Sequence, residues 1–251
     1  MSEESLSGRR ILVTAGATGI GAAISEHLAR EGAHVIINYR SRRSEAEQLR
    51  QRLLQDQLNV SLAPFDVTVP EEVNAQLRAI AEGGGIYGLV HAASAPINEH
   101  HFRKTPWDDF ARHWEVAVKG TFLLLQGAIE LKTPSVLRSV VLVSSSVTLG
   151  APPAQSSAYT TAKYGLLGLA RSVASELASR GVRINCVSPG FANTALTAHV
   201  DERVQELIAK SIPMKRLTLP SDVAGTVAFL MSDSAIYITG VNLPIAGGAV
   251  M

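Results

Sequence analysis

The sequence has one cysteine, almost no net charge and no long apolar segment. Cys186 is the only cysteine among 251 residues, so an internal disulfide bond is excluded. The formal net charge of +1 gives no sign of a nucleic-acid or polyanion partner. No apolar run reaches the roughly 18 residues that a transmembrane helix needs, and the acidic start, Ser2-Glu3-Glu4-Ser5, is unlike a signal peptide. We therefore expect a cytoplasmic protein without a membrane partner.

Short apolar runs alternate along the chain with longer amphipathic segments. The runs predict strands at residues 10–14, 34–38, 60–64, 87–92, 139–145, 182–187 and 240–245. The segments between them predict helices at residues 20–31, 42–57, 70–82, 107–131, 157–179 and 221–231. This alternation is typical of a doubly wound α/β fold, in which helices cover both faces of a parallel sheet. We predict one such domain over residues 1–251, with Cys186 as a buried strand thiol.

A glycine-rich segment links the first predicted strand to the first predicted helix. It reads Ala15-Gly16-Ala17-Thr18-Gly19-Ile20-Gly21. Glycines at such a turn let backbone N–H groups approach a phosphate, and the positive end of the helix dipole adds to the attraction. The alternative is an ordinary strand-to-helix turn.

Tyr159 is followed four residues later by Lys163, within a predicted helix. Residues at i and i+4 lie on the same face of a helix, so the lysine ammonium would lie close to the phenol. The fifth predicted strand delivers Ser144-Ser145-Ser146 upstream of this pair. A nearby cation that lowers the pKa of a phenol makes tyrosine usable as a general acid or base near neutral pH.

Together these two motifs resemble the short-chain dehydrogenase/reductase family, from Arg10 to Met251. The resemblance implies one Rossmann-like domain that binds NADP(H) and reduces a carbonyl, with Tyr159 as the acid and Lys163 as its cationic neighbour. Counting the family's usual spacing back from Tyr159 reaches Ser146 as the polarising serine, whereas the Gly150–Pro153 segment favours Ser145. We predict Ser146. The cofactor-binding residues that the resemblance implies are Thr14, Thr18, Gly19, Ile20, Tyr39, Arg40, Ser41, Asp66, Val67, Ala92, Ala93, Tyr159, Lys163, Pro189, Gly190 and Thr194.

The end of the second predicted strand favours NADPH over NADH. NAD-binding relatives place a carboxylate there to hold the ribose hydroxyls, but this chain has Tyr39 followed by Arg40, Ser41, Arg42 and Arg43. An arginine can clamp a 2′-phosphate that a carboxylate would repel. We predict Arg40 as the main contact, with Ser41 and Arg42 assisting; the alternative is a solvated basic helix start.

Three positions depart from the family pattern. Ala15 replaces the first loop glycine, and His91-Ala92-Ala93-Ser94 replaces Asn-Asn-Ala-Gly. We expect His91 to be a core residue and not a cofactor contact. Ala117 replaces an asparagine that helps hold a proton-relay water in many relatives, so the relay must be altered here.

The substrate is less well defined by the sequence. The strand end Asn38-Tyr39 and the C-terminal segment 245–251 resemble reductases of 3-oxoacyl carrier proteins and related polyketide-type ketoreductases. Arg180 matches an arginine that those enzymes present to the carrier protein, although a helix C-terminus also favours a cation by itself. The irregular stretch 190–220 corresponds to the family's substrate lid, and His100, His101 and Arg103 are candidates for the acyl entrance, with no metal site expected.

Two other functions stay open at this stage. One is a reductase of a small or cyclic free ketone, and the other is a catalytically weak dinucleotide-binding module. Apolar residues on more than one face of the helices at 107–131 and 157–179 predict a homo-oligomer, a dimer or a tetramer.

Overall fold

The structure, a computed structural model, describes residues 6–131, 133, 136–194, 196–198 and 200–250. Its seven strands form one parallel sheet in the order β3-β2-β1-β4-β5-β6-β7. They are β1 Arg10–Thr14, β2 His34–Tyr39, β3 Val60–Pro64, β4 Gly88–His91, β5 Ser139–Val143, β6 Arg183–Pro189 and β7 Asn242–Ile245. The predicted doubly wound sheet is confirmed. Its strand order reverses between β1 and β4, which is where such folds bind their ligands.

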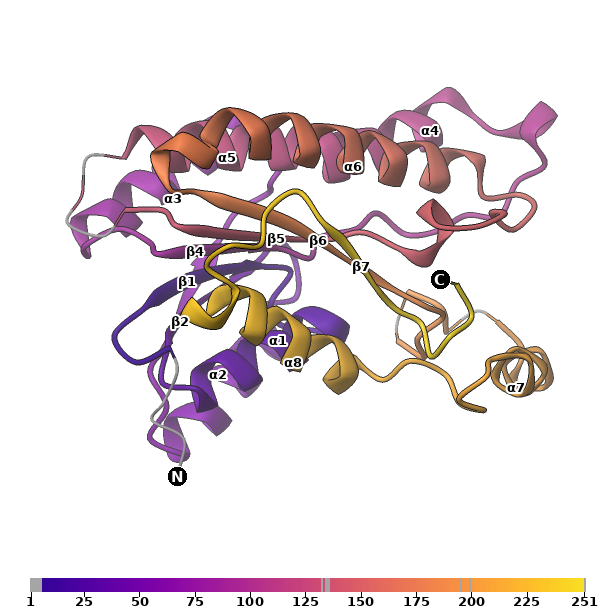
Figure 1. Ribbon diagram of the computed structural model, residues 1–251, viewed down its shortest axis with the longest axis horizontal. Coiled ribbons are helices and arrows are strands. Elements are labelled where there is room, and N and C mark those ends of the chain that lie inside the picture. The colour runs from indigo at the N-terminus through magenta and orange to yellow at the C-terminus, as the bar shows by residue number, and fades with distance from the viewer. Residues whose placement is uncertain (1–5, 132, 134–135, 195, 199, 251) are drawn as a thin grey trace.

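Helices cover both faces of this sheet (Figure 1). One layer holds α3 Pro70–Glu82, α4 Trp107–Trp114, α5 Gly120–Glu130 and α6 Ser157–Leu177, and the other holds α1 Gly19–Arg30, α2 Arg43–Gln55 and α8 Pro220–Met231. Ile11 and Val13 pack into the core under α1 and α8, whereas Leu12 packs into the core on the other face. Because alternate side chains serve two cores, the central residues of these strands are mostly apolar on both faces.

Two predicted elements differ from the structure. The helix predicted at 107–131 is interrupted, because a π-helical turn at Glu115–Lys119 separates α4 from α5. The stretch at 190–220 was predicted to be irregular, but it contains α7 Glu202–Ser211. Asp201 caps α7 by accepting a hydrogen bond from Arg203 N at 2.8 Å. No residue of α7 is buried, so its short apolar pattern did not identify it as a helix.

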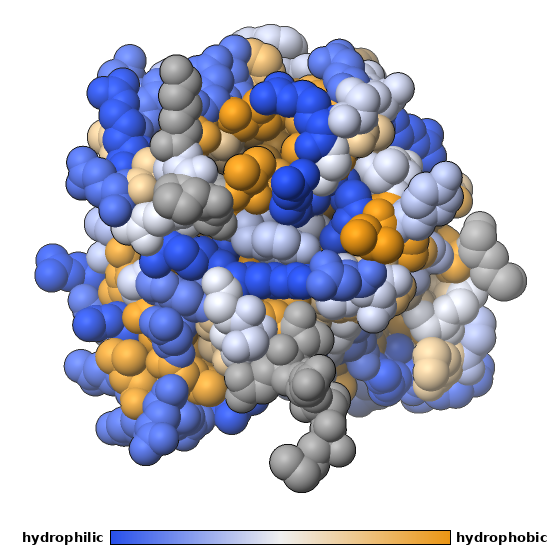
Figure 2. Space-filling view, turned by 60° about the vertical axis from the view of Figure 1, so that its left-hand side comes forward, coloured by the Kyte–Doolittle hydropathy of each residue, from blue (hydrophilic) through white to orange (hydrophobic). Residues whose placement is uncertain are grey.

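The end of the molecule that carries the amino termini of the strands comes forward in Figure 2. It shows hydrophobic patches separated by hydrophilic side chains, with a hollow near the middle. A cavity at this end is lined by Tyr87, Arg138, Arg183 and Tyr237, among others. Arg183 is buried there and donates to the Ser232 carbonyl at 3.3 Å, which ties β6 to the end of α8.

Other sequence expectations concern single residues and the membrane. Cys186 is buried in β6, as predicted, and burial raises the pKa of its thiol to about 12. Within the described part of the chain, no helix is long and apolar enough to cross a membrane. The same residues include no cluster of three or more histidine, cysteine, aspartate or glutamate side chains that could hold a metal ion.

Candidate active site

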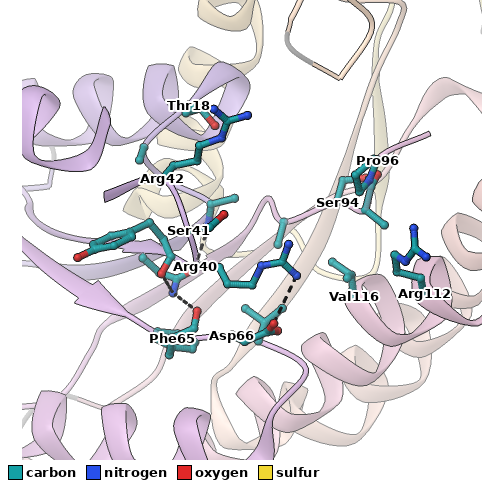
Figure 3. A pocket seen from close by; sticks show the side chains of 17 residues that line it. Thr18, Arg40, Ser41, Arg42, Phe65, Asp66, Ser94, Pro96, Arg112 and Val116 are labelled. Carbon is teal, nitrogen blue, oxygen red and sulfur yellow. Dashed lines mark hydrogen bonds and ion pairs between the residues drawn. The ribbon is translucent and has the colours of Figure 1, made fainter. Parts of the chain in front are cut away.

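A pocket lies over the carboxyl ends of β1 to β4, at the point where the strand order reverses (Figure 3). Its walls come from the β1–α1 turn, the ends of β2, β3 and β4, and the continuous helix formed by α4, the π-helical turn and α5. The lining residues are Ala15, Ala17, Thr18, Asn38, Tyr39, Arg40, Ser41, Arg42, Phe65, Asp66, Val67, Ala93, Ser94, Ala95, Pro96, Arg112 and Val116. Of the cofactor-binding residues that the resemblance implies, the pocket brings together Thr18, Tyr39, Arg40, Ser41, Asp66, Val67 and Ala93.

The β1–α1 turn is shaped to admit a phosphate. A Cβ added to Gly21 would lie 2.1 Å from the Ala15 carbonyl oxygen, and one added to Gly16 would lie 2.8 Å from the Val13 carbonyl oxygen. Only glycine fits at both positions. Thr18 precedes α1 and makes no side-chain capping bond, so the first N–H groups of α1 remain available to an anion. This turn fits the pyrophosphate of a dinucleotide.

Ala15 shows how the chain accommodates the missing loop glycine. Its φ is 49°, in the left-handed region that costs an L-residue roughly 1–2 kcal/mol. The Asn38 side chain holds this conformation by accepting from Ala15 N at 3.1 Å, while its Nδ2 donates to the Ala63 and Phe65 carbonyls. The Asn38 amide therefore joins the loop to the ends of β2 and β3.

The basic end of the pocket holds Arg40, Ser41 and Arg42. The side chain of Arg40 is 64% exposed, and its Nη1 lies 3.4 Å from Asp66 Oδ2, so the pair is loose and accessible. Burial opposes ionisation of Asp66, but hydrogen bonds from Thr68 and the nearby Arg40 outweigh it and lower the pKa of Asp66. Arg42 pairs instead with Glu45 at 2.9 Å. Arg40 is thus the arginine that is positioned to bind a phosphate.

Sequence reasoning missed the pocket wall formed by Ser94, Pro96, Arg112 and Val116. Arg112 and Arg40 approach the pocket from different sides in Figure 3. Arg112 is held only by Asp109, at 3.4 Å, one turn earlier on α4. No sequence motif identifies these residues, because they line the pocket only through the way in which α4 and the π-helical turn pack beside β4.

Tyr159 and Lys163 lie on one face at the start of α6, as predicted. Lys163 Nζ is 5.6 Å from the centre of the Tyr159 ring and donates to the Val143 carbonyl at 2.8 Å. Lys163 is only 4% exposed. The carbonyl at the end of β5 therefore orients the ammonium and leaves two of its protons free for other partners.

Burial changes the pKa values of Lys163 and Tyr159 from those that the sequence suggested. It lowers the pKa of Lys163 to about 8 and raises the pKa of Tyr159, against a smaller lowering by the hydrogen bond between Tyr159 and Ser145. The expected lowering of the Tyr159 pKa is outweighed by burial in this structure, because a buried site disfavours the charged form of both groups.

Ser145 is the serine that lies beside the phenol. Its side chain is the neighbour that acts to lower the pKa of Tyr159, against the larger effect of burial, and it accepts from Val147 N at 3.4 Å. This placement favours Ser145, the alternative that the sequence left open, over the predicted Ser146. The chain leaves β5 after Val143 and enters a 3₁₀ turn at Ser146–Thr148, so Ser145 is the last serine before the chain turns.

Other residues that the resemblance assigned to the cofactor lie at or after the carboxyl ends of β6, β1 and β4. Pro189 ends β6, and the next residue, Gly190, donates its N–H to the Ile245 carbonyl at 3.0 Å. The Thr194 side chain lies 3.7 Å from the Cβ position of Gly19, so the start of the lid segment lies against the glycine-rich turn. Ala92 N and Ala93 N both donate to Thr14 Oγ1.

His113 is a neighbour of Tyr159 that sequence reasoning also missed. Its ring meets the Tyr159 ring edge-on, with centroids 5.8 Å apart. Burial lowers the pKa of His113, although Asp109 one turn earlier acts in the opposite direction. A neutral imidazole therefore packs beside the phenol.

Comparison with known proteins finds reductases and dehydrogenases that match nearly the full chain. The family model described as "Enoyl-(Acyl carrier protein) reductase" matches residues 14–250. The 3-oxoacyl-(acyl-carrier-protein) reductase FabG of Staphylococcus aureus is 33% identical over 247 residues, which cover 96% of this chain and 97% of the relative. The enzyme of the same name from Rickettsia felis is 32% identical over 248 residues, with 98% of both chains covered.

Solved structures agree over nearly the full chain. The NADP active-site complex of Pseudomonas aeruginosa RhlG superposes with a TM-score of 0.90 and 26% identity, over 99% of both chains. A dehydrogenase/reductase from Sinorhizobium meliloti 1021 gives a TM-score of 0.90 and 28% identity, over 98% of this chain and 97% of the other.

Proposed function

The chain belongs to the short-chain dehydrogenase/reductase family, and we propose that it is an NADPH-dependent ketoreductase of a 3-oxoacyl thioester or a related ketone. It is an oxidoreductase that acts on the CH–OH/C=O pair and uses a nicotinamide dinucleotide. The observation that carries the proposal is the placement of Ser145, whose side chain lowers the pKa of Tyr159, beside the buried Lys163. It places two hydroxyl groups where one carbonyl oxygen can accept from both.

Each residue of this group has a role in carbonyl reduction. When bound, a reduced nicotinamide supplies the hydride that adds to the carbonyl carbon. Tyr159 gives its proton to the carbonyl oxygen, and Ser145 donates a hydrogen bond that stabilises the negative charge developing there. The raised pKa of Tyr159 keeps the phenol protonated until it reacts. Lys163, fixed by the Val143 carbonyl, then stabilises the tyrosinate.

The preference for NADPH rests on the basic end of the pocket. Arg40 is exposed and only loosely paired with Asp66, so a 2′-phosphate can compete for its guanidinium. Ser41 and Arg42 line the same end. β2 ends in Tyr39, so the position where NAD-binding relatives place a carboxylate carries no negative charge to repel the phosphate.

The 3-oxoacyl substrate class is supported by the curated relatives named above. The place of Arg180 constrains how a carrier protein would dock. Arg180 lies about 30 Å along α6 from Tyr159, at the end of the molecule opposite the active site. A carrier protein held by Arg180 of the same protomer is therefore far from Tyr159, and a partner protomer in antiparallel contact would bring its own arginine closer.

We propose that residues 1–251 form a single domain. We also propose that copies of this domain associate through the outer face of the helical layer formed by α4, α5 and α6. Trp114, Phe122 and Tyr164 are 44%, 49% and 47% exposed on this face. Large apolar side chains gathered on one face favour burial against another copy. Light scattering at micromolar concentration tests this directly, and a monomer would contradict it.

A substrate screen tests the proposed function. The purified protein is given NADPH or NADH with 3-oxobutanoyl thioester, a cyclic free ketone or a 2-enoyl thioester, and Tyr159→Phe serves as the inactive control. We expect NADPH-dependent reduction of the 3-oxo group that falls by about 10²–10⁴-fold in Tyr159→Phe. Turnover of the cyclic ketone alone would show a free-ketone reductase, and binding without turnover on any substrate would show a dinucleotide-binding module.

A further inference from the structure

His91 is buried at the end of β4 and hydrogen-bonds at both ring nitrogens. Nδ1 lies 3.0 Å from Thr14 Oγ1, and Nε2 lies 3.1 Å from the Val116 carbonyl oxygen. Only 1% of the residue is exposed. The imidazole therefore connects three segments of the chain, which are the end of β1, the end of β4 and the π-helical turn between α4 and α5.

The contacts define the position of the ring proton. A carbonyl oxygen can only accept, so the proton lies on Nε2 and Val116 receives it. Thr14 Oγ1 already accepts from Ala92 N and Ala93 N, so its own proton is free to go to Nδ1 of His91. Every donor in this group has an acceptor, and the ring is neutral. Burial keeps it so, because it lowers the pKa of His91 to about 4.

This network joins two walls of the cofactor pocket. On one wall, Thr14 leads directly into the glycine-rich turn, and its hydroxyl holds the N–H groups of Ala92 and Ala93. On the other wall, Val116 lines the pocket beside Arg112. Because the imidazole of His91 alone bridges from Thr14 to Val116 in this network, the distance between the two walls depends on the size and hydrogen bonding of the residue at position 91.

Two departures from the family pattern meet at the same place. Val116 directly precedes Ala117, and both lie in the π-helical turn Glu115–Lys119. The Ala117 carbonyl accepts from Thr121 Oγ1 at 2.7 Å, so a threonine hydroxyl and the imidazole hold adjacent carbonyls of this turn. The Ala117 side chain itself can make no hydrogen bond. The imidazole thus supplies a polar anchor that alanine at 117 does not.

We propose that His91 is a positioning residue for the dinucleotide, which holds the β1–α1 side of the pocket and the π-helical turn at a fixed separation through Thr14 and Val116. The proposal rests on the proposed function, because it assumes that a dinucleotide occupies the pocket. His91 does not touch the ligand; it acts through the backbone of the residues that do.

The test uses His91→Phe, which keeps a planar ring but removes both hydrogen bonds, and His91→Asn, which keeps an amide but is too short to span both partners. Ser139→Ala is the matched control, since Ser139 is fully buried in the neighbouring strand β5 and loses one bond, to the Leu230 carbonyl, far from the pocket. For each protein, calorimetry measures the Kd of 2′,5′-ADP and of NADPH, and denaturant unfolding measures stability. Nitrogen-15 NMR of the wild type identifies the protonated ring nitrogen.

We expect a neutral ring with its proton on Nε2, and Kd values for NADPH at least tenfold higher in both His91 variants but within twofold of wild type in Ser139→Ala. If a His91 variant folds and keeps its Kd within twofold while losing stability like the control, the residue is only structural and the proposal fails. A proton on Nδ1 would also overturn it. If the wild type binds neither 2′,5′-ADP nor NADPH, the proposed function fails instead, so the two failures are distinguishable.

Discussion

The side chain of Ser145 acts on Tyr159 and lowers the pKa of its phenol, whereas Ser146 begins the following 3₁₀ turn. We therefore propose that Ser145, of the two adjacent serines, shares a carbonyl oxygen with the phenol. Ser145 also has little freedom to move, since it is 8% exposed and its hydroxyl accepts from Val147 N. This geometry separates two residues that the sequence left as alternatives.

Alanine substitutions of the two serines should have unequal effects on turnover. Loss of an oxyanion-type donor typically costs about 10²–10³-fold in kcat, so we expect Ser145→Ala to lose activity on that scale. Ser146→Ala is the matched control, because it also removes one serine hydroxyl but at the residue that begins the 3₁₀ turn. It should keep kcat within about threefold, because no oxyanion-type donor is lost. Steady-state rates with NADPH and one ketone measure both, and the reverse order would restore Ser146 as the polarising serine.

Arg40→Ala should weaken NADPH selectively. A charge-assisted hydrogen bond contributes roughly 1.5–3 kcal/mol, so we expect the Kd for NADPH to rise about tenfold or more and that for NADH to change little. Arg42→Ala is the control at the same end of the pocket. Its side chain is already paired with Glu45, so its effect should be smaller. Equal losses for NADPH and NADH in Arg40→Ala would mean that Arg40 supports the fold and does not bind the phosphate.

The sequence predicted the sheet, the glycine-rich turn and the basic end of the pocket because those features depend on local patterns. Apolar strands such as β1 are bounded by turn residues, and the glycine-rich turn and Tyr159–Lys163 pair occur within single segments. Arg112 and His113 were missed because their positions depend on packing between α4 and its neighbours. The charge states were misjudged for a related reason, since the burial that raises the pKa of Tyr159 is a property of the folded site.

His91 should make the protein sensitive to acid. Burial lowers its pKa from the usual 6.5 to about 4, so the unfolded chain binds more protons than the folded one between these values. Stability should therefore fall as the pH drops from 6.5 to 4, by about 3 kcal/mol, since each pKa unit corresponds to roughly 1.4 kcal/mol. Urea unfolding at a series of pH values measures the slope. His91→Asn cannot titrate there and should show a flatter profile, and identical slopes would contradict the assignment.

The last prediction concerns Ala117, which is 4% exposed in the π-helical turn. With its neighbouring carbonyl held by His91, the turn is already anchored without the family's asparagine. If the enzyme works without the asparagine-held water, proton resupply to Tyr159 must run through Lys163 and solvent by another route. We therefore expect Ala117→Asn to change kcat by less than about tenfold, which is below the roughly 10²–10⁴-fold that a general acid or base contributes, and to leave Tyr159 essential.

The cost of Ala117→Asn to the helix should be a few tenths of a kcal/mol, because asparagine is a poorer helix former than alanine, with a further loss if the buried amide finds no partner. Thr121→Val, which removes the hydroxyl held by the Ala117 carbonyl, is a control for disturbance of the turn itself. Steady-state rates on one reducible ketone, at matched saturation with NADPH, decide the outcome. If the wild type is nearly inert and Ala117→Asn raises turnover a hundredfold or more, Ala117 is a disabling substitution and the natural chain is a dinucleotide-binding module. A change within tenfold, abolished by Tyr159→Phe in both backgrounds, supports an enzyme whose proton supply does not need the asparagine.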